Sequence, residues 1–159
     1  MCAFSLGLAS TGLLLGFTVW VLVIQPLALT RGMPRPKFIG LQMRVVRAWS
    51  RTLIPLTAIG IATALARTGW TTHALPAAAS FAAAVLASVV AIPRALRAGG
   101  ESLRSDEDHG LTPVGFVSEG AGVKTRAWHR VVLASVAIVL AGRLLDVHHA
   151  LASLVRGLL

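Results

Sequence analysis

The sequence predicts an all-α protein, an integral membrane four-helix bundle that forms a single domain over residues 1–159. Hydrophobic residues make up 55% of the chain and charged residues only 13%, and the mean hydropathy is +0.76. Soluble domains carry about 25% charged residues, so this composition indicates a membrane protein. About 20 apolar residues cross a bilayer, and the chain has room for about four such spans with short connections.

The first apolar run predicts a helix over residues 4–30, with no basic residue before it and no convincing cleavage pattern. The run is too long for the core of a signal peptide, so it is expected to remain as a membrane helix. Pro26 is expected to kink or end this helix. Small residues, which allow close approach by another helix, recur along it at Gly7, Ser10, Gly12 and Gly16.

The second helix is expected over residues 42–66, and a basic stretch without acidic residues precedes it. Arg44, Arg47 and Arg51 follow an i, i+3, i+7 spacing, which places them on one helix face. One interpretation is a face whose side chains snorkel to lipid headgroups. The other is a cationic wall that holds an anionic or phenolate ligand, with Gln42 on a neighbouring face.

The third helix, over residues 74–96, is rich in alanine and is expected to approach its neighbours closely and to be the most enclosed of the four. Pro93 is expected to end it or to kink its last turn. A polar loop is predicted over residues 99–123. His109 follows three acidic residues there, but the pattern of a calcium loop is absent, which favours a solvated acidic run.

The fourth helix is expected over residues 127–146 and opens with Trp128, His129 and Arg130. Basic residues and an amphipathic indole are typical of the headgroup region of a bilayer. Near the other end of this helix, Arg143 and Asp146 stand one turn apart, so their side chains could pair across one helix face.

The distribution of Lys and Arg predicts how the helices are oriented. Residues 31–51 and residues 94–130 contain six Lys or Arg each, whereas the other connection and the tail carry few. The positive-inside rule therefore places both long loops in the cytoplasm and both termini outside, in a plasma or inner membrane.

This topology gathers basic and aromatic residues from three helices at the cytoplasmic end of the bundle. Such a site would offer cations for a phenolate or enolate, an apolar shaft for a planar molecule, and an imidazole to move a proton. The predicted catalytic residues are His129, Arg130 and Trp128. The predicted substrate-binding residues are Arg44, Arg47, Arg51, Arg94 and Gln42.

Several other classes of site are not supported by the sequence. Cys2 is the only cysteine, which excludes an intrachain disulfide and a thiolate metal site. No Gly-rich phosphate loop, nucleophile elbow or pair of intramembrane carboxylates is present. No metal or cofactor is therefore expected, although a haem held by His129 remains an alternative. Although the net charge is +9, the basic residues lie at the ends of apolar runs, so the expected partners are lipid and a hydrophobic small molecule, not nucleic acid.

The chain resembles the anthrone oxygenase-like family of small four-helix integral membrane proteins. The residues that carry this resemblance span most of the chain: Val23-Ile24-Gln25-Pro26-Leu27, Leu41-Gln42-Met43, Leu53-Ile54-Pro55, Ala91-Ile92-Pro93-Arg94 and Trp128-His129-Arg130. In that family the third helix commonly ends in an Asn-x-Pro-x-Asn pattern, of which this chain has only the proline.

Family members of known activity oxidise the activated methylene of anthrones to a quinone carbonyl without a tightly bound cofactor. The resemblance therefore implies a tailoring enzyme of secondary metabolism, an oxygenase or related proton-abstracting enzyme for an aromatic or polyketide-like substrate. His129 would remove the acidic proton, while Arg130 with Arg47 or Arg94 would stabilise the enolate. The alternative is a non-catalytic small membrane subunit or scaffold of a larger complex or homo-oligomer, in which these charges serve topology and partner contacts.

Overall fold

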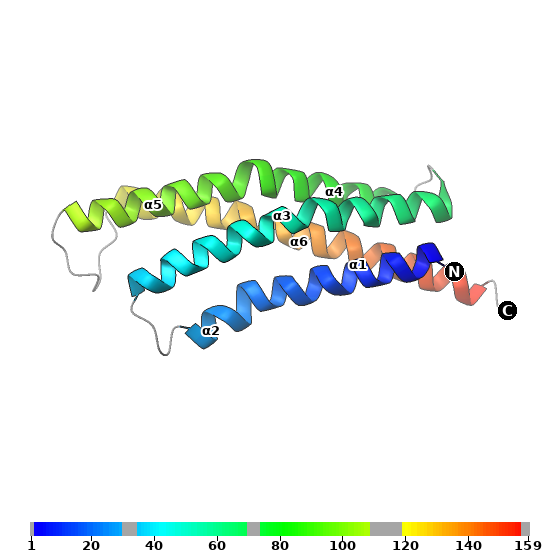
Figure 1. Ribbon diagram of the computed structural model, residues 1–159. Helices are drawn as coiled ribbons and strands as arrows, with labels where there is room; N and C mark the ends of the chain where they lie inside the picture. The colour runs from blue at the N-terminus through cyan, green and yellow to red at the C-terminus, as the bar shows by residue number, and fades with distance from the viewer. Residues whose placement is uncertain (1, 30–34, 70–73, 109–118, 157–159) are drawn as a thin grey trace.

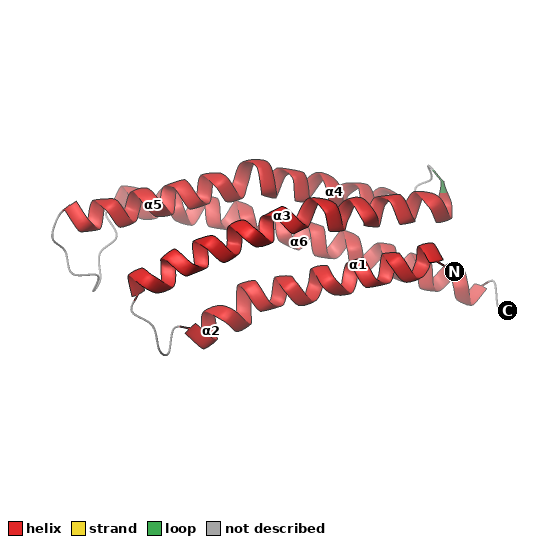
Figure 2. Cartoon of the chain, viewed as in Figure 1, coloured by secondary structure: helices red, strands yellow, loops and turns green. Residues whose placement is uncertain are grey.

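The computed structural model describes residues 2–29, 35–69, 74–108 and 119–156, and in these ranges the chain is a helical bundle (Figures 1 and 2). This confirms the predicted fold class. Four helices are long and apolar enough to cross a membrane: Cys2–Leu27, Gly40–Thr68, Leu75–Gly100 and Arg126–Arg156. Large apolar side chains such as Leu13, Leu27 and Val89 are more than 60% exposed, as a surface that contacts lipid requires.

Two of the spans change helix type near a proline. Each continues through a π-helical turn: the first span is built from α1 (Cys2–Val19), η1 (Trp20–Ile24) and α2 (Gln25–Leu29), and the third from α4 (Leu75–Leu86), η3 (Ala87–Ala91) and α5 (Ile92–Asp108).

Pro26 and Pro93 explain these two turns. A proline has no N–H to donate and its ring collides with the carbonyl of the preceding turn, so the helix widens ahead of it. The residue before each proline accordingly bonds five positions back, Gln25 to the Trp20 carbonyl and Ile92 to the Ala87 carbonyl. Both helices continue past the proline rather than ending there.

The other two spans are single long helices, α3 (Arg35–Thr68) of 34 residues and α6 (Glu119–Arg156) of 38 residues. At about 1.5 Å per residue both are longer than the ~30 Å hydrocarbon core of a bilayer, so they extend beyond it. Gly69 ends α3: its φ is +64°, and its N–H donates to the Leu65 carbonyl at 2.8 Å, which is a common glycine C-cap.

The helices are longer than expected in the polar part of the chain. Instead of a loop over residues 99–123, α5 continues to Asp108 and α6 begins at Glu119. Alanine, leucine, arginine and glutamate are strong helix formers, which favours continuing a helix into water. His109 lies outside the described residues. At its other end, α6 continues ten residues past the predicted end at 146.

Neighbouring spans run antiparallel, and both chain termini lie at one end of the bundle (Figure 1). We call this end the terminal end. The opposite end, where α2, the start of α3, α5 and the start of α6 lie, we call the basic end because it carries most of the arginines of the described chain.

The alanine-rich third span does approach its neighbours closely. A Cβ added to Gly142 of α6 would lie 2.5 Å from the Pro76 carbonyl oxygen, and Ser80 Oγ donates to the Val139 carbonyl at 2.9 Å. Within an apolar 18-residue stretch of this span, however, 39% of the residues are buried, the same share as in the second and fourth spans. The expectation that it is the most enclosed span was therefore wrong.

A hydrogen bond between the second and third spans sets their register. Ser88 Oγ donates to the Ser50 carbonyl at 2.9 Å. The two spans are antiparallel, so a residue six positions after Ser88 lies at about the same depth in the bundle as a residue six positions before Ser50. Arg94 and Arg44 therefore lie at a similar level of the basic end.

Candidate functional site

Two of the predicted site residues meet at the basic end. The guanidinium carbon of Arg94, on α5, lies 5.1 Å from the centre of the Trp128 ring, on α6. This is the geometry of a cation–π contact. The ring is half-buried and packs against the apolar core, whereas Arg94 is exposed.

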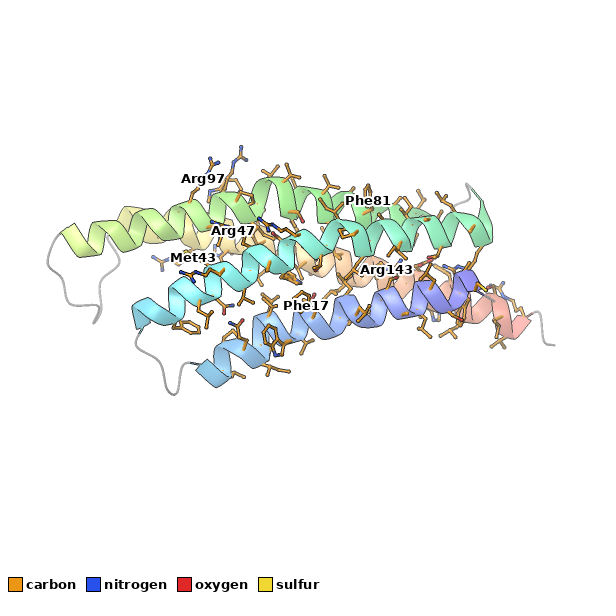
Figure 3. All side chains as sticks on the ribbon, viewed as in Figure 1. Phe17, Met43, Arg47, Phe81, Arg97 and Arg143 are labelled. Atoms are coloured by element: carbon orange, nitrogen blue, oxygen red, sulfur yellow. The ribbon has the colours of Figure 1, made fainter. Side chains whose placement is uncertain are left out.

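The remaining predicted cations and the histidine are all exposed on the bundle: Arg44, Arg47, Arg51, His129 and Arg130. Figure 3 shows Arg47 on α3 and Arg97 projecting outward from α5. The arrangement brings these side chains to one end of the molecule. It does not enclose them in a common cavity with Trp128, because each faces outward.

Gln42 is the predicted substrate-binding residue that points into the bundle. Its Nε2 donates to the Val21 carbonyl in η1 at 3.1 Å. In an α-helix that carbonyl would accept from the N–H of Gln25, but this N–H bonds Trp20, and the next residue, Pro26, has none to offer. Gln42 therefore satisfies a carbonyl that the π turn leaves without a donor.

Four buried polar atoms near this contact have no hydrogen-bond partner within the described part of the chain. They are Thr18 Oγ1, Gln25 Oε1, Gln42 Oε1 and Trp49 Nε1, and we call this group the polar strip. Thr18, Gln25 and Trp49 are each at most 6% exposed. Buried polar groups are normally paired with protein or ordered water, so four unpaired atoms in one region require an explanation.

The positions of these residues place them along one interface. Thr18 and Gln25 flank Val21 on the buried face of the first span, and Gln42 reaches that face through its bond to Val21. Trp49 follows Gln42 by two helical turns on the same side of α3. Trp49 belongs to the same buried apolar cluster as Val21, which places its side chain at this interface.

Thr18 differs from other threonines of the bundle. Five threonine hydroxyls donate to a carbonyl three or four residues earlier in their own helix: Thr11, Thr52, Thr57, Thr63 and Thr68. This local bond is the usual one for a threonine in a membrane helix. The hydroxyl of Thr18 makes no such bond, so its donor remains free for another group.

A second polar cluster lies at the terminal end and centres on Arg143, which is fully buried. Its Nη2 donates to the α1 atoms Gly7 O at 3.0 Å, Ser10 Oγ at 2.9 Å and Thr11 Oγ1 at 2.6 Å. Its Nη1 donates to Asp146 Oδ2 at 3.2 Å, which confirms the pairing expected from the one-turn spacing. Figure 3 labels Arg143 between α1 and α3.

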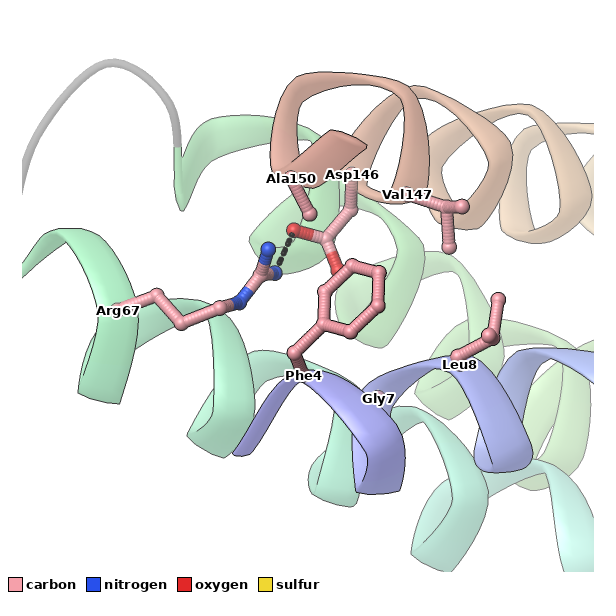
Figure 4. Close-up of a pocket in the computed structure, with 7 residues that line it drawn as sticks. All are labelled: Phe4, Gly7, Leu8, Arg67, Asp146, Val147 and Ala150. Carbon is pink, nitrogen blue, oxygen red and sulfur yellow. Dashed lines mark hydrogen bonds and ion pairs between the residues drawn. The ribbon is translucent and has the colours of Figure 1, made fainter. Parts of the chain in front are cut away.

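Asp146 joins a third side chain to this cluster. Arg67 Nη2, from the last turn of α3, lies 2.7 Å from Asp146 Oδ1. A pocket beside this ion pair is lined by Phe4, Gly7, Leu8, Arg67, Asp146, Val147 and Ala150 (Figure 4). Its cavity volume is about 10 Å³, room for about one water molecule, so the pocket does not enclose a drug-sized ligand.

A glycine makes room for the buried guanidinium. A Cβ added to Gly60 of α3 would overlap the guanidinium group of Arg143. Gly7 is constrained as well, since its added Cβ would lie 3.0 Å from Thr63 Oγ1. Gly12 and Gly16, in contrast, face open space, so only part of the small-residue series of the first helix serves close packing.

Partial signals for the other polar residues of these two clusters are present in the sequence. An arginine near the end of an apolar run is expected to face the bundle interior, and this would have pointed to Arg143. A glutamine immediately before a helix proline would have pointed to Gln25. Trp49 had no distinguishing signal, because a tryptophan on a membrane helix is equally typical of an interface.

Among the described residues, no group of three or more His, Cys, Asp or Glu side chains could hold a metal ion. Comparisons of the chain with protein-family models, with curated proteins and with solved structures found no match. Any function of this chain must therefore be inferred from its residues and their geometry.

Proposed function

We propose that this chain is a membrane-embedded tailoring enzyme, an oxygenase or related proton-abstracting enzyme for a hydrophobic aromatic substrate. The observation that carries the proposal is the polar strip, a group of hydrogen-bonding atoms that are buried in the bundle and have no partner among the described residues. A lipid-soluble molecule that carries a few oxygen atoms could form hydrogen bonds with these atoms. In small-molecule sites, a few buried polar groups fix the orientation of the ligand in this way.

The hydrogen-bonding types in the strip favour a hydroxylated substrate. Gln42 Nε2 is committed to the Val21 carbonyl, which fixes the amide so that its oxygen remains as an acceptor. Gln25 Oε1 is a second acceptor, Trp49 Nε1 is a donor, and the Thr18 hydroxyl can act as either. Phenolic hydroxyls would donate to the two amide oxygens, and a ring oxygen would accept from the indole.

One residue of the strip and one predicted catalytic residue adjoin the same apolar cluster. Trp49 and Val21 belong to this cluster, and Trp128 packs against it from α6. A planar substrate held by the strip would extend along these apolar side chains toward Trp128. Arg94, over the Trp128 ring, would place a cation near the end of such a molecule.

The proposed chemistry is the conversion of an activated methylene to a carbonyl with dioxygen. His129 would remove a proton from the methylene, and Arg130 with Arg94 or Arg47 would stabilise the resulting enolate. Dioxygen would then react with the carbanion. One of its oxygen atoms would remain in the new carbonyl, and the other would leave as water with the two methylene hydrogens.

A non-catalytic membrane subunit or scaffold is the second candidate. It is favoured by the outward orientation of His129, Arg130 and the α3 arginines, since exposed cations suit headgroups and partner chains better than an enclosed reaction. In both cases we propose that the basic end faces the cytoplasm and that both termini lie outside, in a plasma or inner membrane, because positive charge is retained on that side.

The test is turnover of an anthrone by the purified protein, followed by oxygen uptake and by the absorbance of the quinone product. His129→Ala should abolish turnover. His148→Ala, which changes an exposed histidine at the other end of the same helix, is the matched control and should leave turnover intact. Turnover that persists in His129→Ala would remove this residue from the mechanism.

The contribution of the polar strip can be measured separately. Gln25→Leu removes an acceptor that has no partner among the described residues, so it should raise KM several-fold and leave kcat nearly unchanged. An unchanged KM would exclude the strip from substrate binding. If the wild-type protein turns over no anthrone and is recovered in a stable complex with another membrane protein, the subunit proposal replaces the enzyme.

A further inference from the structure

The ion cluster at the terminal end carries unbalanced positive charge. Its two guanidinium groups, from Arg67 and Arg143, share the single carboxylate of Asp146, so the three side chains have a net charge of +1. Both carboxylate oxygens already accept a hydrogen bond. A charge that is removed from water without a counter-charge is costly, so this cluster favours an anion nearby.

The excess charge reaches the surface at Arg67. Arg143 is fully buried, and its two Nη atoms are occupied by Asp146 and by α1. Arg67 donates through Nη2 to Asp146 and through Nε to the Thr63 carbonyl at 3.1 Å, and its side chain is 19% exposed. Its remaining amino group is therefore the donor that an external anion could reach.

The pocket next to Arg67 has one charged wall and one apolar wall (Figure 4). Phe4, Leu8 and Val147 form the apolar wall, and Leu8 is 47% exposed at the outside of the bundle. Arg67 stands one residue before the end of its span at Thr68, and headgroups are expected near the end of a membrane-crossing helix. An amphiphile with an anionic head would match both walls.

We propose that this pocket binds the phosphate headgroup of an anionic phospholipid. The phosphate contacts the guanidinium of Arg67, and the first part of an acyl chain packs against Phe4, Leu8 and Val147. Although Asp146 also lines the pocket, its charge is neutralised by two guanidinium groups. An anionic lipid balances the cluster, whereas phosphatidylcholine brings its own cation and does not.

The shape of the pocket is consistent with a surface-bound lipid. Its cavity volume is about 10 Å³, so the headgroup rests at the mouth of the pocket against Arg67 while its chains remain in the bilayer. The site lies at the opposite end from the basic residues and the polar strip. It is therefore independent of the proposed enzymatic function, and lipid binding can be tested without any turnover.

The test compares phosphatidylglycerol with phosphatidylcholine of the same acyl chains, added to the purified full-length protein in detergent. Thermal unfolding and native mass spectrometry report stabilisation and retained lipid. Arg67→Gln leaves a neutral Arg143–Asp146 pair, and it should lower the affinity for phosphatidylglycerol roughly tenfold or more, as loss of a charged hydrogen bond does. Arg156→Gln is the control, because it removes an exposed arginine near the same end.

Two further variants separate binding from folding. Leu8→Ala changes an exposed position, so it should fold normally and retain phosphatidylglycerol less well. Arg67→Lys keeps the charge and should keep the preference over phosphatidylcholine. An equal preference in wild type and Arg67→Gln would overturn the proposal. Inorganic phosphate that stabilises the wild type as well as the lipid does would also overturn it, because the site would then bind a free anion.

Discussion

The side-chain amide of Gln42 donates to the backbone carbonyl of Val21 at 3.1 Å, across the interface between α3 and the π turn of the first span. The bond links one side chain to a backbone defect in another helix, since Pro26 is the reason that the carbonyl lacks a helical donor. It also fixes which way the Gln42 amide points, and so which atom remains for a ligand.

This relationship can be tested with a double-mutant cycle. Gln42→Leu should destabilise the protein by about 1–3 kcal/mol, because it leaves a buried carbonyl unpaired. In a Pro26→Ala background a backbone N–H is restored, so the same change should cost about 1 kcal/mol less. Unfolding in mixed micelles, followed by circular dichroism, measures the coupling. Strict additivity of the two changes would contradict this account.

Gly60 should be intolerant of substitution. The added methyl group of Gly60→Ala would overlap the Arg143 guanidinium, which is held by α1 and Asp146 and cannot move away freely. We expect a loss of about 1–3 kcal/mol in unfolding free energy from overpacking. Gly12→Ala is the matched control: its methyl group meets no atom within 4 Å, so it should be neutral or stabilising by up to about 1 kcal/mol.

Asp146→Asn should be among the most damaging single changes in the bundle. It removes the carboxylate that pairs with both the Arg67 and the Arg143 guanidinium groups. Breaking a buried ion pair from one side costs about 3–5 kcal/mol. Thermal unfolding in detergent measures the loss, with Arg156→Gln as an exposed control. A shift in Tm no larger than that of the control would show that the cluster contributes little to stability.

Trp49→Phe should have opposite effects on the free and the ligand-bound protein. The indole N–H is buried without a partner in the described part of the chain, so its removal should leave the free protein as stable as before or more stable by up to about 1 kcal/mol. Affinity for a hydroxylated aromatic ligand should fall several-fold. Trp20→Phe, at an exposed position, controls for loss of an indole. A marked loss of stability in the free protein would contradict an unpaired N–H.

The architecture could be predicted from the sequence because hydropathy is a local property. Apolar runs of membrane length specify helices wherever they occur, since a bilayer provides no partner for unpaired backbone groups. The Arg143–Asp146 pair was also predictable, because it depends on a spacing of three residues within one helix. The structure of the polar segment near residue 108 was harder to predict, because glycines and acidic residues are compatible with both a loop and a solvated helix.

The candidate site was predicted only in part, because it depends on which helix faces rotate inward. Spacing placed Arg44, Arg47 and Arg51 on one face, but only the packed bundle decides that this face is exposed. Likewise, no pattern along the chain could bring Arg67 to Asp146 or Gln42 to Val21, which are 79 and 21 residues apart.

By itself, then, the sequence determined four membrane helices, the ends at which their charges collect and the prolines that interrupt their regularity. The tertiary structure decided which polar groups become buried and which of them find partners. Local properties follow from neighbours in the chain, whereas burial and pairing follow from contacts between helices, and these exist only after the four spans have packed.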